Sequence, residues 1–513
     1  MTKFKLNKKY NIIFIFLIGV FTSFSLPPYN NLFINFITIP LFYILVLKNI
    51  NLSKWKIFFL GWTFGFGYFC SNLYWITNSL TFDPQFKFLI PIASIVIPSF
   101  LGIFYGLISF LFSYFKNREK IILIFIFAVI FSLVEFLRGF IFGGFPWNII
   151  AYSWTKYLSS IQILSYIGTY TFNLLSITLF LIPSIAFLKV KNSFKIISLL
   201  IVFLVLLSNH IYGSSVLKKS KSKVNNLDFK VKIVSPKISI MRFLQESDPK
   251  KTIKDLILIS KPKLNERTIF IYPEGILPSI SLQNIQNYKH IISEHFSKNH
   301  IIVMGINSYK NQNKFDEIYN SLAVFDNELN VLFKYDKNNL VPFGEFLPFE
   351  FFFSKFGLKK ITQGYQSFSS GNKREVINIF NKNFLPLICY EIIYSGRLKK
   401  KLDEFDFILN LSEDGWFGDS IGLNQHFSHS IFRAIEEGKY LIRSANNGSS
   451  AYINFNGEVL ESIKSTESGV IEVHYYQKPS ETLFSSQGNK IFFYFIAFYI
   501  ILIFFFKKKG SLK

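Results

Sequence analysis

Cys389 is one of only two cysteines in the 513-residue chain, and its surroundings allow chemistry. Residues 385–390 form an apolar run that predicts a buried strand carrying the thiol to its C-terminal end, and Glu391 follows two positions after the cysteine. A free cysteine is most often a small buried hydrophobic residue, so the thiol alone predicts no function. A reactive thiol also needs a base or a cation, because the thiolate is the attacking species.

Glu274 and Lys337 are the residues that could activate this thiol. Residues 268–272 predict a strand that runs into a Pro-Glu-Gly turn, so Glu274 falls where active-site loops of open α/β sheets gather. Lys337 follows a second predicted strand, residues 331–335. In isolation, each is more typical of an ordinary solvated turn. Together, a glutamate can take and return the thiol proton, and a lysine can stabilise the thiolate and then an oxyanion. With the backbone N–H of Tyr390 as a second oxyanion donor, these groups predict a thiol acyltransferase or an amidase.

The elements that must position these residues predict an α/β domain. From about residue 213 onward, short apolar stretches alternate with polar, helix-like ones, and the segment is long enough for one full core. The predicted helices cover residues 248–259, 281–298 and 422–438. The predicted strands cover residues 229–234, 268–272, 300–305, 321–325, 331–335, 385–390, 407–411 and 450–455.

The rest of the chain predicts a membrane domain. Hydrophobic residues make up 50% of the sequence, and eight apolar runs approach or exceed the roughly 20 residues that a helix needs to cross a bilayer. We interpret the first run as a retained helix and not as a signal peptide, because no small-residue cleavage site follows it. The runs cover residues 11–27, 31–47, 57–76, 88–115, 121–145, 162–188, 196–212 and 491–506.

The net charge of +24 belongs to this membrane pattern. In a soluble protein such a charge would suggest nucleic-acid binding, but here many lysines sit in short clusters between apolar runs, so no nucleic-acid partner is predicted. The basic clusters occupy alternate connections, which places both termini in the cytoplasm and the polar segment outside. Cys70 falls inside the third run, so Cys389 should stay an unpaired thiol in an oxidising compartment.

Two further features allow alternative interpretations. Glu135 and Arg138 stand three apart on one face of a predicted membrane helix, where ionisable residues are costly. They either contact lipid headgroups or form a structural ion pair. Residues 346–353, with Phe356 and Leu358, are too apolar for an ordinary exposed loop. We interpret them as an arm that dips into the outer leaflet, with a plain core segment as the alternative.

Six motifs resemble those of apolipoprotein N-acyltransferases, bacterial inner-membrane enzymes with a periplasmic nitrilase-like domain. The similarity covers essentially the whole length, with seven spans, the domain and a final span, and residues 340–345 are its most distinctive part. The motifs are Glu135-Phe136-Leu137-Arg138 with Gly144-Phe145-Pro146-Trp147; Tyr272-Pro273-Glu274; residues 335–345; Cys389-Tyr390-Glu391; Trp416-Phe417-Gly418-Asp419; and Arg443-Ser444-Ala445-Asn446-Asn447-Gly448.

The resemblance implies an organisation and a set of roles. It implies a polytopic membrane domain of seven transmembrane helices at residues 1–212, an extracytoplasmic catalytic domain with a four-layer αββα sandwich fold at 213–490, and a C-terminal helix with a basic cytoplasmic tail at 491–513. It further implies that the enzyme uses no metal or organic cofactor. The implied catalytic triad is Glu274, Lys337 and Cys389, and the implied supporting or substrate-binding residues are Glu345, Tyr390, Glu391 and Trp416.

The chain departs from the family pattern at three places. Tyr272 replaces the usual tryptophan, and Glu413 stands where the family tends to have asparagine. The turn after the first strand, residues 234–239, lacks the family's Gln-Gly-Asn-Ile-Pro-like sequence. These departures bear on substrate contacts more than on the chemistry.

The implied reaction has two steps. Cys389 attacks an ester of a membrane phospholipid, the acyl donor, forming a thioester and releasing a lysophospholipid. The N-terminal amine of the diacylglyceryl-cysteine of an apolipoprotein, the acceptor, then attacks the thioester, with Glu274 as acid in the first step and base in the second. The alternatives are a membrane-tethered amidase, against which the full membrane domain argues, and a non-catalytic scaffold or transporter, against which the intact triad argues.

Overall fold

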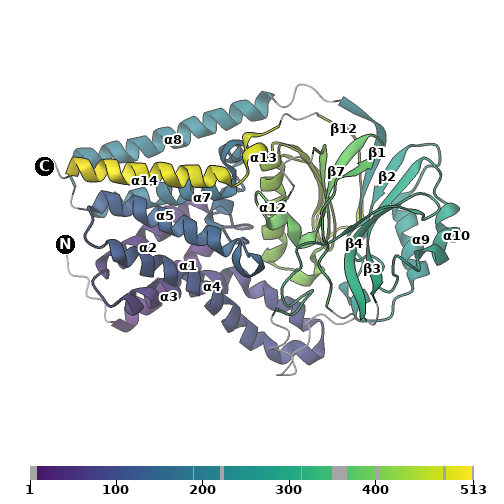
Figure 1. Cartoon of the computed structure of the whole chain (residues 1–513), viewed down its shortest axis with the longest axis horizontal. Helices are drawn as coiled ribbons and strands as arrows, with labels where there is room; N and C mark the ends of the chain where they lie inside the picture. Colours follow the sequence, from purple (N-terminus) through teal and green to yellow (C-terminus); the bar gives the residue numbers. More distant parts are fainter. Residues whose placement is uncertain are drawn as a thin grey trace. The chain divides into compact units, whose positions relative to one another are not determined.

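The computed structural model describes residues 8–188, 190–219, 225–312, 315–348, 367–398, 404–477 and 481–510. It divides into two compact units, each of which is described by itself (Figure 1). The first consists of Met1–Thr77, Phe88–Lys219 and Thr482–Lys513, and the second of Asn78–Lys87 and Ser220–Glu481. The apolar arm predicted at residues 346–353, with Phe356 and Leu358, lies outside the described residues from position 349 onward.

Helices build the first unit, and each of the eight predicted apolar runs overlaps one of them. Among the described residues, four stretches are long and apolar enough to cross a membrane: Pro84–Phe115, Lys120–Arg138, Leu164–Phe187 and Asn192–Lys219. Shorter apolar helices cover Ile12–Ser23, Leu32–Lys48 and Lys490–Phe506. The helices of the unit are α1 (Lys8–Ser23), α2 (Asn35–Lys48), α3 (Lys54–Leu73), α4 (Ile90–Phe112), α5 (Lys120–Arg138), α6 (Leu158–Ile161), α7 (Leu164–Leu181), α8 (Asn192–Lys219), α13 (Leu483–Gln487) and α14 (Lys490–Gly510).

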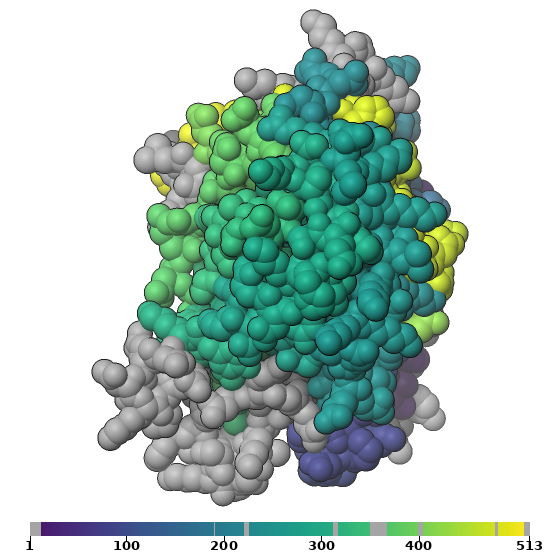
Figure 2. All heavy atoms as spheres, turned by 90° about the vertical axis from the view of Figure 1, so that its right-hand side faces the viewer, coloured from purple at the N-terminus to yellow at the C-terminus, as the bar shows by residue number. Residues whose placement is uncertain are grey.

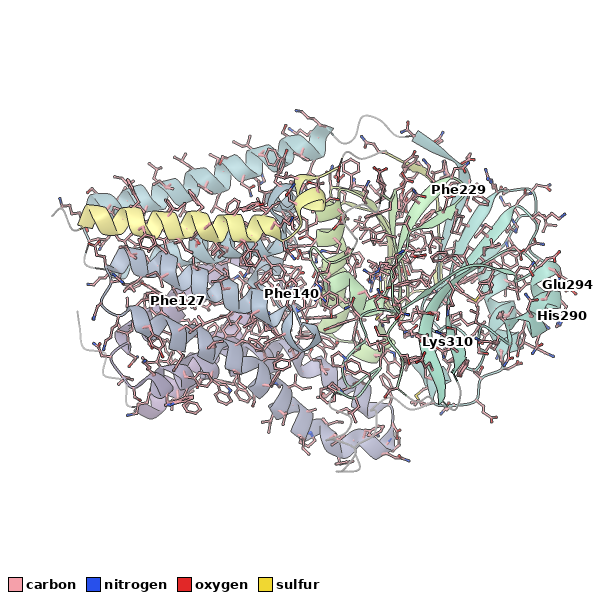
Figure 3. All side chains as sticks on the ribbon, in the orientation of Figure 1. Phe127, Phe140, Phe229, His290, Glu294 and Lys310 are labelled. Carbon is pink, nitrogen blue, oxygen red and sulfur yellow. The ribbon has the colours of Figure 1, made fainter. Side chains whose placement is uncertain are left out.

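Small residues bring neighbouring helices of this unit into close contact. A Cβ added at Gly19 of α1 would sit 2.1 Å from the carbonyl oxygen of Phe64 on α3. A Cβ added at Gly61 of α3 would sit 2.3 Å from the carbonyl oxygen of Tyr105 on α4. Such contacts let helices pack backbone to backbone, which is how helices associate where lipid removes the hydrophobic driving force. Large aromatic side chains fill the remaining space, as at Phe127 of α5, which is fully buried (Figure 3).

Glu135 and Arg138 form a buried ion pair at the end of α5. Arg138 Nη2 lies 2.7 Å from Glu135 Oε2. The guanidinium also donates to the carbonyl oxygen of Phe145, and the N–H of Phe145 donates back to the carbonyl oxygen of Arg138 at 2.9 Å. The pair therefore fastens the loop that carries Pro146 and Trp147 to the end of the helix. Of the two interpretations drawn from the sequence, the structure shows the ion pair.

Two six-stranded sheets form the frame of the second unit. One has the order β12-β1-β2-β3-β4-β5, with β1, β2 and β3 mutually parallel, and the other has the order β11-β10-β9-β8-β7-β6, with β7, β8 and β9 parallel. The strands are β1 (Asn225–Ser235), β2 (Thr268–Ile271), β3 (His300–Gln312), β4 (Phe315–Phe325), β5 (Val331–Asp336), β6 (Ile377–Ile379), β7 (Lys382–Ile388), β8 (Phe407–Glu413), β9 (Tyr440–Asn446), β10 (Ser450–Ile453), β11 (Val459–Ile463) and β12 (Gly469–Tyr476).

The sheets and helices of this unit are stacked in four layers. Both sheets contribute to one apolar core, with Val231 and Leu322 from the first and Leu409 and Ile442 from the second. A second core joins the first sheet to α9 (Pro249–Ser260) and α10 (Lys289–Ser293), which form the teal face in Figure 2. On the other side, α12 (Ile421–Glu437) covers the second sheet (Figure 1). The predicted αββα sandwich is confirmed.

The predicted strands are all present, but four further strands were not predicted from the sequence: β6, β9, β11 and β12. β9 is buried throughout and yet contains Arg443 and Asn446, so no apolar run marks it. The helix predicted at residues 281–298 was wrong, since the chain there forms the 3-10 helix Ile285–Tyr288 and the short α10. Its first residues pair with β3 instead, through the N–H of Leu282 and the carbonyl oxygen of Asn307 at 2.8 Å.

Candidate active site

Cys389 lies at a strained turn at the end of β7. The strand ends at Ile388, two residues before the predicted end, and Cys389 opens the 3-10 helix Cys389–Ile393. The φ angle of Cys389 is 49°, a left-handed conformation that costs a non-glycine residue roughly 1–3 kcal/mol and that gathers at functional sites. The thiol group is nearly buried, and so is Tyr390 beside it.

Glu391 is fully buried and stabilises this turn through hydrogen bonds. Its Oε2 accepts a hydrogen bond from the N–H of Ile388 at 2.9 Å. Its Oε1 accepts from the Tyr335 hydroxyl at 2.7 Å, from Arg374 Nη2 at 2.6 Å and from the N–H of Asn338 at 3.0 Å. Glu391 thus joins the cysteine turn to the loop after β5, which carries the predicted cation. Its carboxylate is hydrogen-bonded to the protein at both oxygens and is not exposed.

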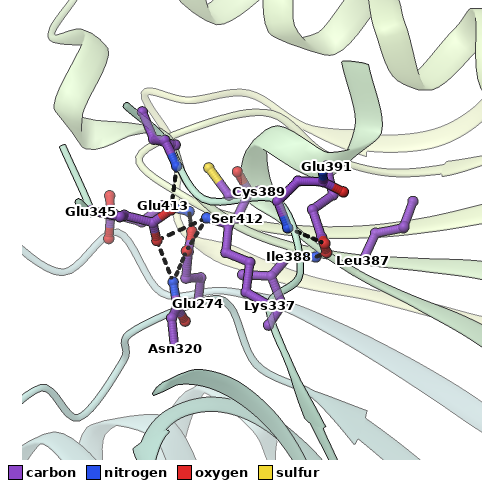
Figure 4. Close-up of polar contacts among 12 residues, drawn as sticks. Glu274, Asn320, Lys337, Glu345, Leu387, Ile388, Cys389, Glu391, Ser412 and Glu413 are labelled. Atoms are coloured by element: carbon purple, nitrogen blue, oxygen red, sulfur yellow. Dashed lines mark hydrogen bonds and ion pairs between the residues drawn. The ribbon is translucent and has the colours of Figure 1, made fainter. Parts of the chain in front are cut away.

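Glu274 lies just past β2, as predicted, and is only 7% exposed. Its Oε1 accepts from Asn320 Nδ2 at 2.7 Å and lies 3.3 Å from Lys337 Nζ. Its Oε2 accepts from the backbone N–H of Glu413 at 2.9 Å. Gly305 of β3 permits this placement, because a Cβ there would sit 2.5 Å from the Cα of Glu274. Both carboxylate oxygens are therefore oriented by the protein itself (Figure 4).

Lys337 is 1% exposed and lies between two glutamates. Its Nζ is 3.0 Å from Oε1 of Glu345 and 3.3 Å from Oε1 of Glu274. Glu345 is itself held by the N–H of Val341, which donates to its Oε2 at 2.8 Å. Burial works against the charge on Lys337, but the negative charges around it prevail and hold its pKa well above the ordinary value. The site therefore keeps a permanent cation.

Asn320 and Ser412 belong to this cluster and were not predicted from the sequence. Asn320 of β4 donates to Oε1 of Glu274 at 2.7 Å and to Oε1 of Glu345 at 2.8 Å, so one amide orients both carboxylates. Ser412 of β8 donates its hydroxyl to Oδ1 of Asp414 at 2.6 Å, and it also lowers the pKa of the Cys389 thiol. The one signal in the sequence was a polar side chain inside an otherwise apolar strand, and that pattern also fits a solvent-facing position.

The thiol of Cys389 is held in its protonated form. Burial raises its pKa well above the ordinary value, and the negative charges of Glu274 and Asp414 act in the same direction. The charge of Lys337 and the polar side chain of Ser412 oppose this shift without reversing it. The cysteine is therefore not a preformed thiolate, and a base must remove its proton when it reacts.

This protonation state predicts how Cys389 responds to pH. In a Cys70→Ala background, its alkylation by iodoacetamide should be slow at pH 7 and should still be rising above about pH 9, because an ordinary thiol ionises near 8.5 and this one ionises later. Mass spectrometry of the modified peptide measures the rate at each pH. A rate that levels off between pH 6 and 8 would contradict the prediction, since it would reveal a thiolate already stabilised by Lys337.

A second buried network lies behind the thiol. Cys389, Asp414 and His426 offer three potential metal-ligand atoms within 4.8 Å of one another. Asp414, however, is paired with Arg443, whose Nη2 lies 2.7 Å from its Oδ2, and it accepts from His426 Nδ1 at 3.0 Å. The guanidinium places a positive charge where a cation would have to bind. These residues fit an internal ion-pair network better than a metal site.

Trp416 lies in the short 3-10 helix that follows β8 and is half-buried. Its ring packs against Phe243, with centroids 5.2 Å apart, and against Phe82, with centroids 5.9 Å apart. Phe82 belongs to the short segment of the second unit that connects α3 to α4. Asn78 of the same segment donates to the carbonyl oxygen of Phe417 at 2.7 Å. The loop that carries Trp416 is thus held from two sides.

Comparisons with known proteins agree with this architecture. Residues 18–182 match the model of the apolipoprotein N-acyltransferase N-terminal domain, and residues 284–477 match that of carbon-nitrogen hydrolases. The apolipoprotein N-acyltransferase of Brucella melitensis biotype 1 is 30% identical over 477 residues, which cover 89% of this chain and 88% of that protein. The one of Rhizobium rhizogenes is 31% identical over 434 residues, covering 82% and 80%.

Solved structures of the same superfamily resemble about half of the chain. A CN-hydrolase superfamily protein from Xanthomonas campestris is 14% identical, with a TM-score of 0.35, over 49% of this chain and 91% of that one.

Proposed function

The chain belongs to the apolipoprotein N-acyltransferase family, and from this premise we propose how its residues perform the transfer. It is a membrane-bound acyltransferase of bacterial lipoprotein maturation. We propose that Cys389 accepts an acyl chain from a membrane phospholipid as a thioester. The thioester then passes the chain to the N-terminal amine of the diacylglyceryl-cysteine of an apolipoprotein.

The grouping of base, cation and thiol is the single observation that carries this proposal. Glu274 and Lys337 lie 3.3 Å apart, both almost fully buried, and the charges of both act on Cys389. They come from loops of one sheet, whereas the thiol comes from the other sheet, so the site depends on the sandwich as a whole. A protonated thiol beside an oriented carboxylate and a cation is the arrangement that nucleophilic acyl transfer requires.

In the first step, Glu274 removes the thiol proton as the sulfur of Cys389 attacks the ester carbonyl carbon. The oxyanion that forms is stabilised by Lys337 and by the backbone N–H of Tyr390. Glu345 supports this step by holding the ammonium of Lys337 in place. Glu274 then gives its proton to the departing alkoxide, so that the lysophospholipid leaves as an alcohol and the thioester remains.

In the second step, the amine of the acceptor attacks the thioester carbonyl carbon. Glu274 takes the proton that the amine nitrogen loses, and the carbon–sulfur bond breaks to release the product amide. The proton returns to the sulfur, where the high pKa of the Cys389 thiol favours it. The free thiol and the ionised Glu274 carboxylate are thereby restored.

The membrane setting follows from the two substrates, which are both anchored in a bilayer. We propose that all eight apolar helices span the membrane, that both termini are cytoplasmic, and that residues 213–490 form the catalytic domain on the periplasmic side. The alternation of basic clusters between the apolar runs supports this orientation.

The products of the purified chain test this proposal. The chain is incubated in detergent with a phospholipid labelled in its acyl chain and with a diacylated lipopeptide, and the lipopeptide N-terminus is analysed by mass spectrometry. We expect a gain of one labelled acyl chain on the amine together with an equal amount of lysophospholipid. Free fatty acid without an N-acylated product would instead indicate a hydrolase. A folded chain that yields neither product would overturn the proposal.

A further inference from the structure

Arg242 and Glu413 form a buried ion pair beside the active site. Their side chains are 4% and 1% exposed, and Arg242 Nη2 contacts Oε2 of Glu413 directly. The same Oε2 accepts from Asn446 Nδ2 at 2.7 Å, and Oε1 accepts from the N–H of Gly415 at 2.8 Å. Burial raises the pKa of Glu413, and the guanidinium and these donors oppose that shift. The guanidinium of Arg242 thus offsets part of the cost of burying the Glu413 carboxylate.

Both members of the pair reach Glu274 through the backbone. The N–H of Glu413 donates to Oε2 of Glu274 at 2.9 Å. Nε of Arg242 donates at 3.1 Å to the carbonyl oxygen of Gly275, the residue that follows Glu274. A closed ring of contacts therefore runs from the Glu274 carboxylate to Glu413, across the ion pair to Arg242, and back to the backbone next to Glu274.

We propose that the Arg242–Glu413 pair is a positioning device for Glu274, which fixes the direction in which this base receives and returns its proton. The two oxygens of Glu274 are held differently. Oε1 is oriented by side chains, through Asn320 and Lys337, whereas Oε2 is oriented by a backbone N–H. That N–H points correctly as long as the Glu413 side chain is anchored. The pair acts through Glu274 and touches no reacting atom itself.

The same pair holds the turn after β1. This turn, residues 234–239, precedes Arg242. Nη1 of Arg242 donates to the carbonyl oxygen of Ser239 at 3.1 Å, and the side-chain amides of Asn446 and Asn447 each donate to that of Ile238 at 2.8 Å. The altered turn is therefore built into the ring, and a buried carboxylate at position 413 provides the partner that the guanidinium needs.

This inference rests on the proposed role of Glu274, and a double-mutant cycle tests it. Arg242→Met, Glu413→Gln and the double variant are compared with the wild-type chain in the rate of acyl-enzyme formation from a labelled phospholipid, measured over a range of pH. Each single substitution should lower kcat for acylation about tenfold or more and leave KM little changed. The double variant should be no slower than the slower single variant. Its loss in rate should therefore be about tenfold smaller than the product of the two single losses.

The pH dependence distinguishes positioning from mere stability. Loss of a neighbouring positive charge makes a carboxylate easier to protonate, so the acidic limb of the acylation profile should move to higher pH in Arg242→Met. Lys232→Met is the matched control. Lys232 is a buried cation of β1 that donates to the carbonyl oxygens of Ser260 and Lys261, both at 2.9 Å. Its loss should lower the melting temperature and leave the acidic limb in place.

The measurements distinguish a failure of the positioning role of Arg242 and Glu413 from a failure of the proposed acyl transfer. If the wild-type chain forms an acyl-enzyme while folded Arg242→Met and Glu413→Gln variants keep its rate and pH profile, the positioning role fails and the proposed function stands. Losses that multiply in the double variant would likewise overturn the coupling. If the wild-type chain forms no acyl-enzyme, the proposed function itself fails.

Discussion

Replacing Cys389 by alanine is expected to abolish acyl-enzyme formation and N-acylation together. Removing a nucleophile that works with a base as one unit lowers kcat by roughly ten-thousand-fold or more. The loss should appear in kcat and not as weaker lipid binding, because the thiol is nearly buried and contributes little contact surface. Incorporation of a labelled acyl chain from phospholipid into the protein, followed on a denaturing gel, measures it.

Cys70→Ala is the matched control for this experiment. Cys70 is the other cysteine of the chain and lies on α3 in the first unit, whereas Cys389 belongs to the second unit. Its removal should leave labelling unchanged, and hydroxylamine should release the label from the wild-type and Cys70→Ala proteins alike. A thioester that persists in the Cys389→Ala variant would remove the basis of the proposed mechanism.

Replacing Lys337 by methionine should damage both catalysis and stability. Loss of the cation leaves two neighbouring carboxylates, the buried Glu274 and the partly buried Glu345, without their partner. Removing one partner of a buried pair costs about 3–5 kcal/mol. Loss of a group that stabilises an oxyanion costs about a hundredfold to a thousandfold in kcat. Acylation rates and thermal unfolding of the same preparation measure the two effects separately.

The stability loss in Lys337→Met should have a defined pH dependence. The folded pKa of Lys337 is raised above its unfolded value, so its contribution is fully present below about pH 10 and fades only as the pH rises through the folded pKa. The difference in melting temperature between wild type and variant should therefore be constant from pH 6 to pH 9. A difference that grows or vanishes within that range would show that Lys337 is not the permanent cation of the site.

The proposed catalytic residues could be found in the sequence, but the groups that hold them in place could not. Glu274, Lys337 and Cys389 each follow a strand whose apolar run is visible in the sequence. Arg242 is 171 residues from Glu413, and Asn320 is 46 residues from Glu274. No local pattern in the sequence marks such partners. Asn320 meets Glu274 only when β4 joins the sheet that contains β2, and Arg242 meets Glu413 only when the two sheets pack together.

The same limit applies to the strands. β7 and β8 each contain a mostly apolar, buried run, which is typical of parallel strands and easy to detect. β9 lies beside β8 and is equally buried, but its polar side chains are neutralised by Asp414, Asn410 and Glu413 from other elements. These contacts offset the cost of burying the polar side chains of β9, and they cannot be seen in the sequence. The polar partners of the site and the strand β9 were therefore missed for the same reason, because both depend on contacts between residues far apart in the sequence.

The pairing of β1 with β12 has a consequence for how such a protein could arise. These are the first and last strands of the sandwich, and they run antiparallel, with Asn225 opposite Tyr476. The chain therefore enters and leaves the sandwich at the same point, as in domains that tolerate insertion into another chain. A complete αββα enzyme could be spliced between two membrane helices, or excised from between them, by a single genetic event that leaves every strand of both sheets paired as before.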